Sequence, residues 1–188
     1  MREALWTLVA FFVSLPPVAE LLYRIAQRQP YAPIMSPDGT TLYMWRGWLF
    51  NPYRKGPDNQ TIPARWQWLP SIRVHVIMRE DIDRHLHDHP WNARTIVLRG
   101  WYVEERLSDD RPQVPSNGAN GTIDGFVKQS KTFHIRDKGH TGRLLYGQFH
   151  RITKVKPGGV MTLFFTWPYR GEWGFLVDGR KVLFKDYK

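Results

Sequence analysis

Histidines are the residues of this sequence whose type and spacing most clearly allow chemistry. Three of the seven histidines fall within five residues, at His85, His87 and His89. Alternate residues of a β-strand share one face, so a strand here would point the three imidazole rings in the same direction. Neutral imidazole is a common ligand of Zn, Fe, Ni and Cu. The pattern therefore favours a metal site over the alternative, which is a polar strand face turned to solvent.

The segment that contains these histidines resembles the first motif of the cupin superfamily. His87 and His89 form the His-x-His pair of that motif, and Gly100 stands in the place of its closing glycine. Two positions depart from the family pattern, since Asp81 replaces the first glycine and Ala93 replaces the glutamate.

A second segment resembles the second cupin motif. Gly139, Gly147 and His150 have the expected spacing, whereas Leu145 replaces the proline and Lys154 replaces the asparagine. The two motifs occur in the order that cupins have. The surrounding sequence is similar to that of a group of small phage and prophage cupin-like proteins of unassigned function.

The resemblance implies a fold and a metal centre. It implies a jelly-roll β-barrel in which His87, His89 and His150 hold one divalent ion, such as Fe, Zn, Mn or Ni. Cupins that lack the motif glutamate include three-histidine iron dioxygenases, in which an anionic substrate supplies the negative charge. The resemblance therefore implies a non-haem iron oxygenase that acts on a small anionic molecule. The alternative is a non-catalytic binding protein, or a membrane-associated accessory protein, whose barrel holds a metal.

Further polar residues are candidates for binding the substrate. Arg73 and His75 alternate along an apolar segment and so share a face, where Arg73 would serve as a clamp for an anion. Glu104 is a candidate acid or base, or a hydrogen-bond partner for a ligand histidine. For each residue, the alternative is a solvent-facing position or a surface ion pair. The candidate substrate-binding residues are Arg73, His75, His85, Arg94, Tyr102, Glu104 and Lys154.

Short apolar runs separated by turn residues predict the elements that would position these side chains. From residue 71 onward the runs have no helical period, which is typical of an all-β sandwich or barrel. We therefore expect a single cupin-type barrel over residues 31–188. Gly100 would take the positive φ of a hairpin turn between two strands, and His150 would begin a third strand. The polar stretch 108–125 is expected to form a surface loop or an elaborated hairpin.

The N-terminal residues differ in composition from the rest of the chain. Residues 4–19 carry no charge, and Arg24 and Arg28 follow them. A cleaved signal, a membrane anchor and a packed or interfacial helix are the three interpretations. We expect residues 1–30 to form an apolar helical segment in which 4–23 dock on a membrane or on the barrel, and we expect a cytoplasmic location.

Composition sets the remaining limits. The chain has 188 residues and no cysteine, which excludes disulfides, iron–sulfur clusters and thiolate zinc sites. Its net charge of +10 favours an anionic partner. The basic residues are scattered and no nucleic-acid-binding motif is present, so nucleic acid is not expected. We expect a small anionic ligand, and the sequence leaves open a membrane surface and a homo-oligomer.

Overall fold

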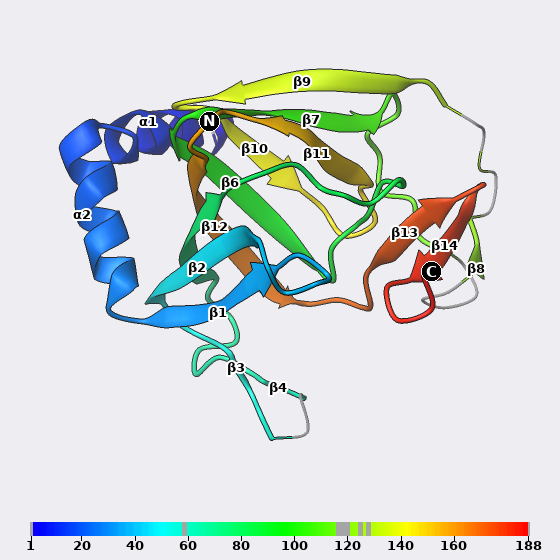
Figure 1. Cartoon of the computed structure of the whole chain (residues 1–188), viewed down its shortest axis with the longest axis horizontal. Helices are drawn as coiled ribbons and strands as arrows, with labels where there is room; N and C mark the ends of the chain where they lie inside the picture. Colours follow the sequence, from blue (N-terminus) through cyan, green and yellow to red (C-terminus); the bar gives the residue numbers. More distant parts are fainter. Residues whose placement is uncertain (1, 58–59, 116–120, 124–125, 127–128, 188) are drawn as a thin grey trace.

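The structure of the chain is a computed structural model that describes residues 2–57, 60–115, 121–123, 126 and 129–187. Its described part contains two helices followed by strands (Figure 1). In chain order these are α1 (Arg2–Val13), α2 (Pro16–Gln27), β1 (Pro30–Met35), β2 (Leu42–Phe50), β3 (Arg54–Lys55), β4 (Thr61–Ile62), β5 (Ser71–Ile77), β6 (Trp91–Arg99), β7 (Trp101–Leu107), β8 (Gly121–Thr122), β9 (Lys131–Asp137), β10 (Thr141–Leu144), β11 (His150–Val155), β12 (Val160–Tyr169), β13 (Gly174–Val177) and β14 (Arg180–Leu183).

The strands form antiparallel sheets, as the short apolar runs predict. The largest sheet has the order β1-β2-β5-β12-β6-β10, and a three-stranded sheet has the order β11-β7-β9. A second three-stranded sheet joins β13, β14 and β8, and β3 pairs with β4. The prediction of a mostly β protein is confirmed. The hydrogen bonds join the strands into separate sheets, so a closed barrel stays a prediction, as does the domain boundary at residue 30.

The six-stranded sheet has two faces of different character. On one face, alternate residues of β5, β6 and β12 enter an apolar core with the helices; they include Val74, Ile96, Leu98, Leu163 and Phe165. The residues between them, such as Arg73, His75, Thr95 and Thr162, face the other way and line a cavity. Strand alternation therefore gives the sheet one apolar face that packs on the helices and one face with polar side chains that line the cavity.

The N-terminal segment forms two helices, and the prediction of one helix over 4–23 is wrong. Leu15 has an extended backbone because the proline that follows it disfavours the helical region, and Pro16 begins α2. The helices pack against the six-stranded sheet through Ala10, Ala19 and Ala26 (blue in Figure 1). Gly47 of β2 allows the close approach of α2, since a Cβ there would collide with the carbonyl of Ala26.

The helices do not meet the requirements of a single membrane span. Among the described residues, no one helix is long and apolar enough to cross a bilayer. Together α1 and α2 meet the length and hydropathy requirement, but the pair is bent by 84°. Association with a membrane surface and a cytoplasmic location stay predictions.

The positive φ predicted at Gly100 is confirmed, but the predicted hairpin is wrong, because β6 pairs with β12 and β10 whereas β7 pairs with β11 and β9. Gly100 has a φ of 84° and connects β6 to β7, which belong to the two facing sheets. His150 begins β11, again as predicted. The predicted loop over 108–125 lies partly outside the described residues, and its described part contains the two-residue strand β8.

Candidate metal centre

A cavity of about 1130 Å³ lies between the six-stranded sheet and the sheet of β7 and β11. Its walls come from β1, β2, β5, β6 and β12 on one side and from β7 and β11 on the other. His87, His89 and His150 all line it. The motif histidines therefore reach one space from two distant parts of the sequence.

The segment that holds His87 and His89 is not the continuous strand that the alternation predicts. His87 exchanges two backbone hydrogen bonds with His150, each of 2.9 Å, and it also forms a bridge with Phe175 of β13. The segment is thus held between β11 and β13 at isolated points. His85 lies outside this register, and its Nδ1 is 2.9 Å from the hydroxyl of Tyr187. The prediction that all three histidines share one face is therefore wrong for His85.

The three histidines of the two cupin-like motifs form a compact cluster. One ring nitrogen of each of His87, His89 and His150 lies within 4.8 Å of the other two. The Nε2 atoms of His89 and His150 are 2.9 Å apart. The indole of Trp91 stacks on the His89 ring at 4.7 Å with an interplanar angle of 10°, which fixes the orientation of that ring.

Burial keeps His87 and His89 uncharged. Removal from water lowers the pKa of His87 to about 4, because the charged imidazolium is poorly solvated there. The same burial holds the pKa of His89 well below its ordinary range, and the neighbouring histidines add to this effect. Neutral imidazoles keep a lone pair, which is the form that binds a metal.

Glu104 fixes the tautomer of His150. Its carboxylate accepts a hydrogen bond of 2.8 Å from His150 Nδ1, so the lone pair of the neutral ring is on Nε2, toward His89. Although burial alone would raise the pKa of Glu104, the hydrogen bond from His150 and the Arg106 guanidinium hold it well below its usual range. Arg106 and Arg136 donate to the same carboxylate at 3.0 and 2.8 Å. Glu104 is therefore an ionised group that orients a histidine.

The cluster fits a divalent metal ion. Three neutral nitrogen donors in a cavity suit Fe, Zn, Mn or Ni, and a carboxylate that orients one donor is typical of such sites. His87 Nδ1 is buried and has no hydrogen-bond partner among the described residues, so an ion would satisfy it. The group contains no carboxylate ligand within the part of the chain that the structure describes. Ala93, in the place of the motif glutamate, packs in an apolar cluster with Leu144 and Phe164.

Four of the other predicted residues line the same cavity. Arg73 and His75 lie on β5 and are buried, and Arg73 Nε donates a hydrogen bond of 2.7 Å to His75 Nε2. The His75 ring stacks on Phe164 at 4.7 Å. Tyr102 and Glu104 approach from β7, and burial raises the pKa of the Tyr102 hydroxyl. Arg73, His75, Tyr102 and Glu104 are therefore placed where a bound molecule could meet them.

His85, Arg94 and Lys154 lie outside the cavity, so the structure does not bring them to the predicted site. His85 contacts Tyr187. Arg94 points to the helix-covered face of β6, where it donates two hydrogen bonds of 2.8 Å to Glu3 of α1. Lys154 is exposed on β11 and lies 6.0 Å from the centroid of the Trp101 ring. Strand phase explains Arg94, because its neighbour Thr95 takes the cavity side.

Sequence reasoning did not identify Arg46, Trp91 or Phe164 as parts of the site. All three line the cavity, Arg46 from β2 and the two aromatic residues from β6 and β12. A lone charge in the otherwise apolar strand 42–50 is a signal that could have identified Arg46. The two aromatic residues carry no such signal, because a core ring and a cavity wall look alike in a sequence.

The sheets and the converging motif histidines support the resemblance to cupins. Similar solved structures include an iron(II) form of HppE, with 12% identity, a TM-score of 0.44 and coverage of 74% of this chain and 57% of that protein. Oxalate oxidase has 12% identity and a TM-score of 0.44 over 76% and 60% of the two chains. A cupin-like protein from Thermotoga maritima has 14% identity and a TM-score of 0.39 over 77% and 81%.

These similarities are partial. The chain spans less than two thirds of the length of the first two proteins. Comparison with models of protein families gives no match, and comparison with curated proteins gives none either. The case for function rests on the site itself, and the phage-type subgroup stays a prediction.

Proposed function

We propose that this chain is a metal-binding cupin that holds one divalent ion with His87, His89 and His150. The observation that carries the proposal is the convergence of three histidine ring nitrogens within 4.8 Å of one another. The ion would be held by neutral ligands alone and would keep its double positive charge. Such a centre favours an anion in its open coordination positions.

The leading activity is that of a non-haem iron oxygenase on a small anionic molecule. An iron ion would supply the activation of dioxygen when bound. The chain's own residues would hold the ligand histidines in place: Trp91 covers the His89 ring, and Glu104 keeps His150 in the ligand tautomer. The cavity of about 1130 Å³ is large enough for a small substrate.

A non-catalytic metal-containing binding protein is the second candidate. One observation favours it: the Glu104 carboxylate already accepts from His150, Arg106 and Arg136. A carboxylate with its lone pairs engaged in this way is not available as a general base. The centre would then hold an anion without transforming it.

Metal analysis of untagged protein tests the shared part of both proposals. We expect one ion per chain in the wild type and in His85→Ala, and little bound metal in His150→Ala. The His85 variant is a matched control because His85 belongs to the same histidine segment but lies outside the cavity. Full metal content in His150→Ala would contradict the assignment.

Oxygen consumption separates the two candidates. Iron(II)-loaded protein is mixed with a panel of small carboxylates and phosphate esters, and dioxygen uptake is recorded. Uptake that requires both the iron and one of these anions, and that is lost in His150→Ala, supports the oxygenase. Anion binding without any uptake would overturn it in favour of the binding protein.

A further inference from the structure

Two arginine side chains face the cavity from neighbouring strands. Arg46 on β2 pairs with His75 across the sheet, and Trp48 pairs with Arg73 on β5. The register makes the two arginines diagonal neighbours on one face of the sheet. Both line the cavity that contains the histidine cluster. Two positive charges of the same wall therefore lie close together.

Neither arginine has a carboxylate partner among the described residues. Arg73 is only 2% exposed, and its polar contacts are His75 Nε2 and the hydroxyl of Tyr53. Arg46 donates to the carbonyl oxygen of Ala32 and lies 4.4 Å above the Tyr31 ring. Burial and the charge of Arg73 both lower the pKa of Arg46. Aromatic rings lie against both guanidinium groups, but no carboxylate of the described residues offsets their mutual repulsion.

Other buried arginines of this chain are compensated. Arg94 is 3% exposed and makes a bidentate contact with Glu3, whereas Arg106 contacts both Glu104 and Asp110. A buried charge without a partner is costly, so it is expected where a ligand supplies the opposite charge. Among the described residues, the buried Arg73 and the half-buried Arg46 beside it do not follow the pattern of Arg94 and Arg106.

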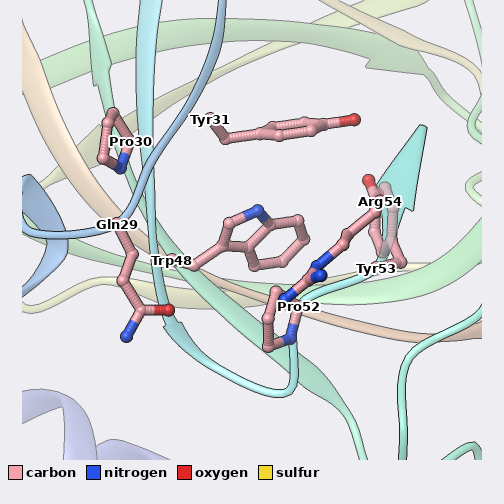
Figure 2. A pocket seen from close by; sticks show the side chains of 7 residues that line it. All are labelled: Gln29, Pro30, Tyr31, Trp48, Pro52, Tyr53 and Arg54. Carbon is pink, nitrogen blue, oxygen red and sulfur yellow. The ribbon is translucent and has the colours of Figure 1, made fainter. Parts of the chain in front are cut away.

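Aromatic side chains shape the space around these arginines. The rings of Tyr31, Trp48 and Tyr53 contact one another, with centroid distances of 4.8–5.8 Å (Figure 2). Tyr31 and Tyr53 line both the small pocket of Figure 2, about 240 Å³ in volume, and the large cavity. Their hydroxyl groups can donate to an oxyanion, as guanidinium groups do.

The arginine pair and the histidine cluster are within reach of one small molecule. The guanidinium carbon of Arg73 is 5.6 Å from the centroid of the Trp91 ring. That ring stacks on His89 at 4.7 Å. Trp91 and Phe164, with centroids 5.6 Å apart, form an apolar wall between the two groups.

We propose that Arg46 and Arg73 form an oxyanion subsite for the carboxylate or phosphate group of a small organic acid with an apolar body. The body would lie against Trp91 and Phe164, and its far end would reach the histidine cluster. The placement of the far end rests on the proposed function. The subsite itself needs no metal, because both of its charges belong to the protein.

Calorimetric titration with benzoate and with inorganic phosphate tests the subsite. The proteins are the zinc-loaded wild type, the metal-poor His150→Ala variant, Arg46→Gln, Arg73→Gln and the control Arg79→Gln. Arg79 also lines the cavity, but its charge is directed to Asp83, where it opposes the rise in pKa that burial causes. We expect each of the first two arginine substitutions to weaken the better probe roughly tenfold or more, the cost of losing a hydrogen bond from a charged donor. Arg79→Gln should bind as the wild type does.

The outcomes separate this subsite from the metal centre. Arg-dependent binding that persists in His150→Ala supports the subsite, and it would do so even if the wild type bound no metal and the proposed function failed. Wild-type affinity in Arg46→Gln would overturn the subsite while leaving the metal centre intact. Arg46 is only half-buried, so that variant decides the matter if Arg73→Gln does not fold. Failure of the wild type to bind either probe would also overturn the proposal, and the tighter probe identifies the anionic group.

Discussion

Two regions of this molecule bury charged side chains, and they do so in opposite ways. Behind the histidine segment, Asp88 and Lys181 are both completely buried and form an ion pair that links the segment to β14. Asp88 also accepts a hydrogen bond of 2.8 Å from the backbone of Gly174. On the cavity wall, Arg46 and Arg73 share no carboxylate among the residues that the structure describes.

The difference indicates which charges serve the fold and which serve a ligand. Burial of a charge costs free energy that a partner must offset. At the Asp88–Lys181 junction the chain supplies that partner, so both residues stabilise the fold. At the cavity wall the described residues supply no carboxylate, so we assign that role to a bound anion. The two regions should therefore respond differently to the loss of a charge.

The largest expected effect is at the junction. Lys181→Met leaves the buried Asp88 carboxylate without its counter-ion, and we expect a loss of about 3–5 kcal/mol in the free energy of unfolding. Urea unfolding followed by circular dichroism measures it. Lys185→Met is the control, because Lys185 is exposed and pairs with Glu172 at the surface. Similar losses of unfolding free energy in the two variants would show that the buried ion pair contributes no more to stability than the surface pair.

A smaller effect is expected at Glu104, the charge that connects the fold to the metal centre. Glu104→Gln removes the negative charge that orients His150, so zinc affinity should fall roughly 10- to 100-fold. Competition with a chromogenic chelator measures it. Glu105→Gln is the matched control, since Glu105 is equally buried but pairs with Arg151 and Lys131. Equal zinc affinity in Glu104→Gln and the wild type would show that the carboxylate does not act through His150.

A pH-dependent effect is expected at His75. Burial and the nearby Arg73 hold the pKa of His75 well below the ordinary value of 6.5. The folded state therefore keeps His75 neutral while the unfolded state takes up a proton, and stability is lost as pH falls below about 6.5. His75→Gln keeps an acceptor for Arg73, and should lose less stability on acidification.

Unfolding of both proteins in urea at pH 7 and pH 5 measures the difference. The wild type should lose more, by up to about 1.4 kcal/mol for each pH unit in that window. The other histidines are present in both proteins, so the comparison isolates His75. Parallel pH profiles would mean that His75 titrates normally.

The smallest effect is expected at the cavity wall. Arg46→Gln removes one of two charges that repel each other, so in buffer without phosphate or carboxylate the variant should be as stable as the wild type, or more stable. Thermal unfolding measures this. Benzoate should then raise the melting temperature of the wild type more than that of the variant. A large destabilisation by Arg46→Gln without any anion would show that this arginine belongs to the fold, as Lys181 does.

Local patterns predicted the parts of the fold that depend on neighbours in the sequence. The turn at Gly100 requires a positive φ, and His150 begins a strand after a turn-rich stretch, so both are visible in the sequence. Residues 42–50 are rich in aromatic side chains, which is typical of a strand, and they form β2. The spacing of the two cupin-like motifs predicted that His87, His89 and His150 converge.

The remainder depends on contacts between distant residues. Strand phase places Arg94 on the helix-covered face of β6, but its partner there, Glu3, lies 91 residues earlier in the chain. His85 lies apart from the cluster because the segment is not a continuous strand. The segment is bridged to β11 and β13 at His87, so the alternation of a strand does not extend to His85. To recognise that Arg46 and Arg73 have no counter-ion among the described residues, one must know every side chain that surrounds them in the folded chain. The sequence alone does not show which strands pair, so it does not show which side chains surround these arginines.

Anomalous diffraction from crystals of the zinc-loaded protein would locate the metal ion. We expect one zinc peak in the cavity, about 2.0–2.1 Å from one ring nitrogen of each of His87, His89 and His150. The same crystals soaked with benzoate should show its carboxylate between Arg46 and Arg73. A zinc ion bound elsewhere, or one that fewer than three of these histidines ligate, would contradict the proposed metal centre.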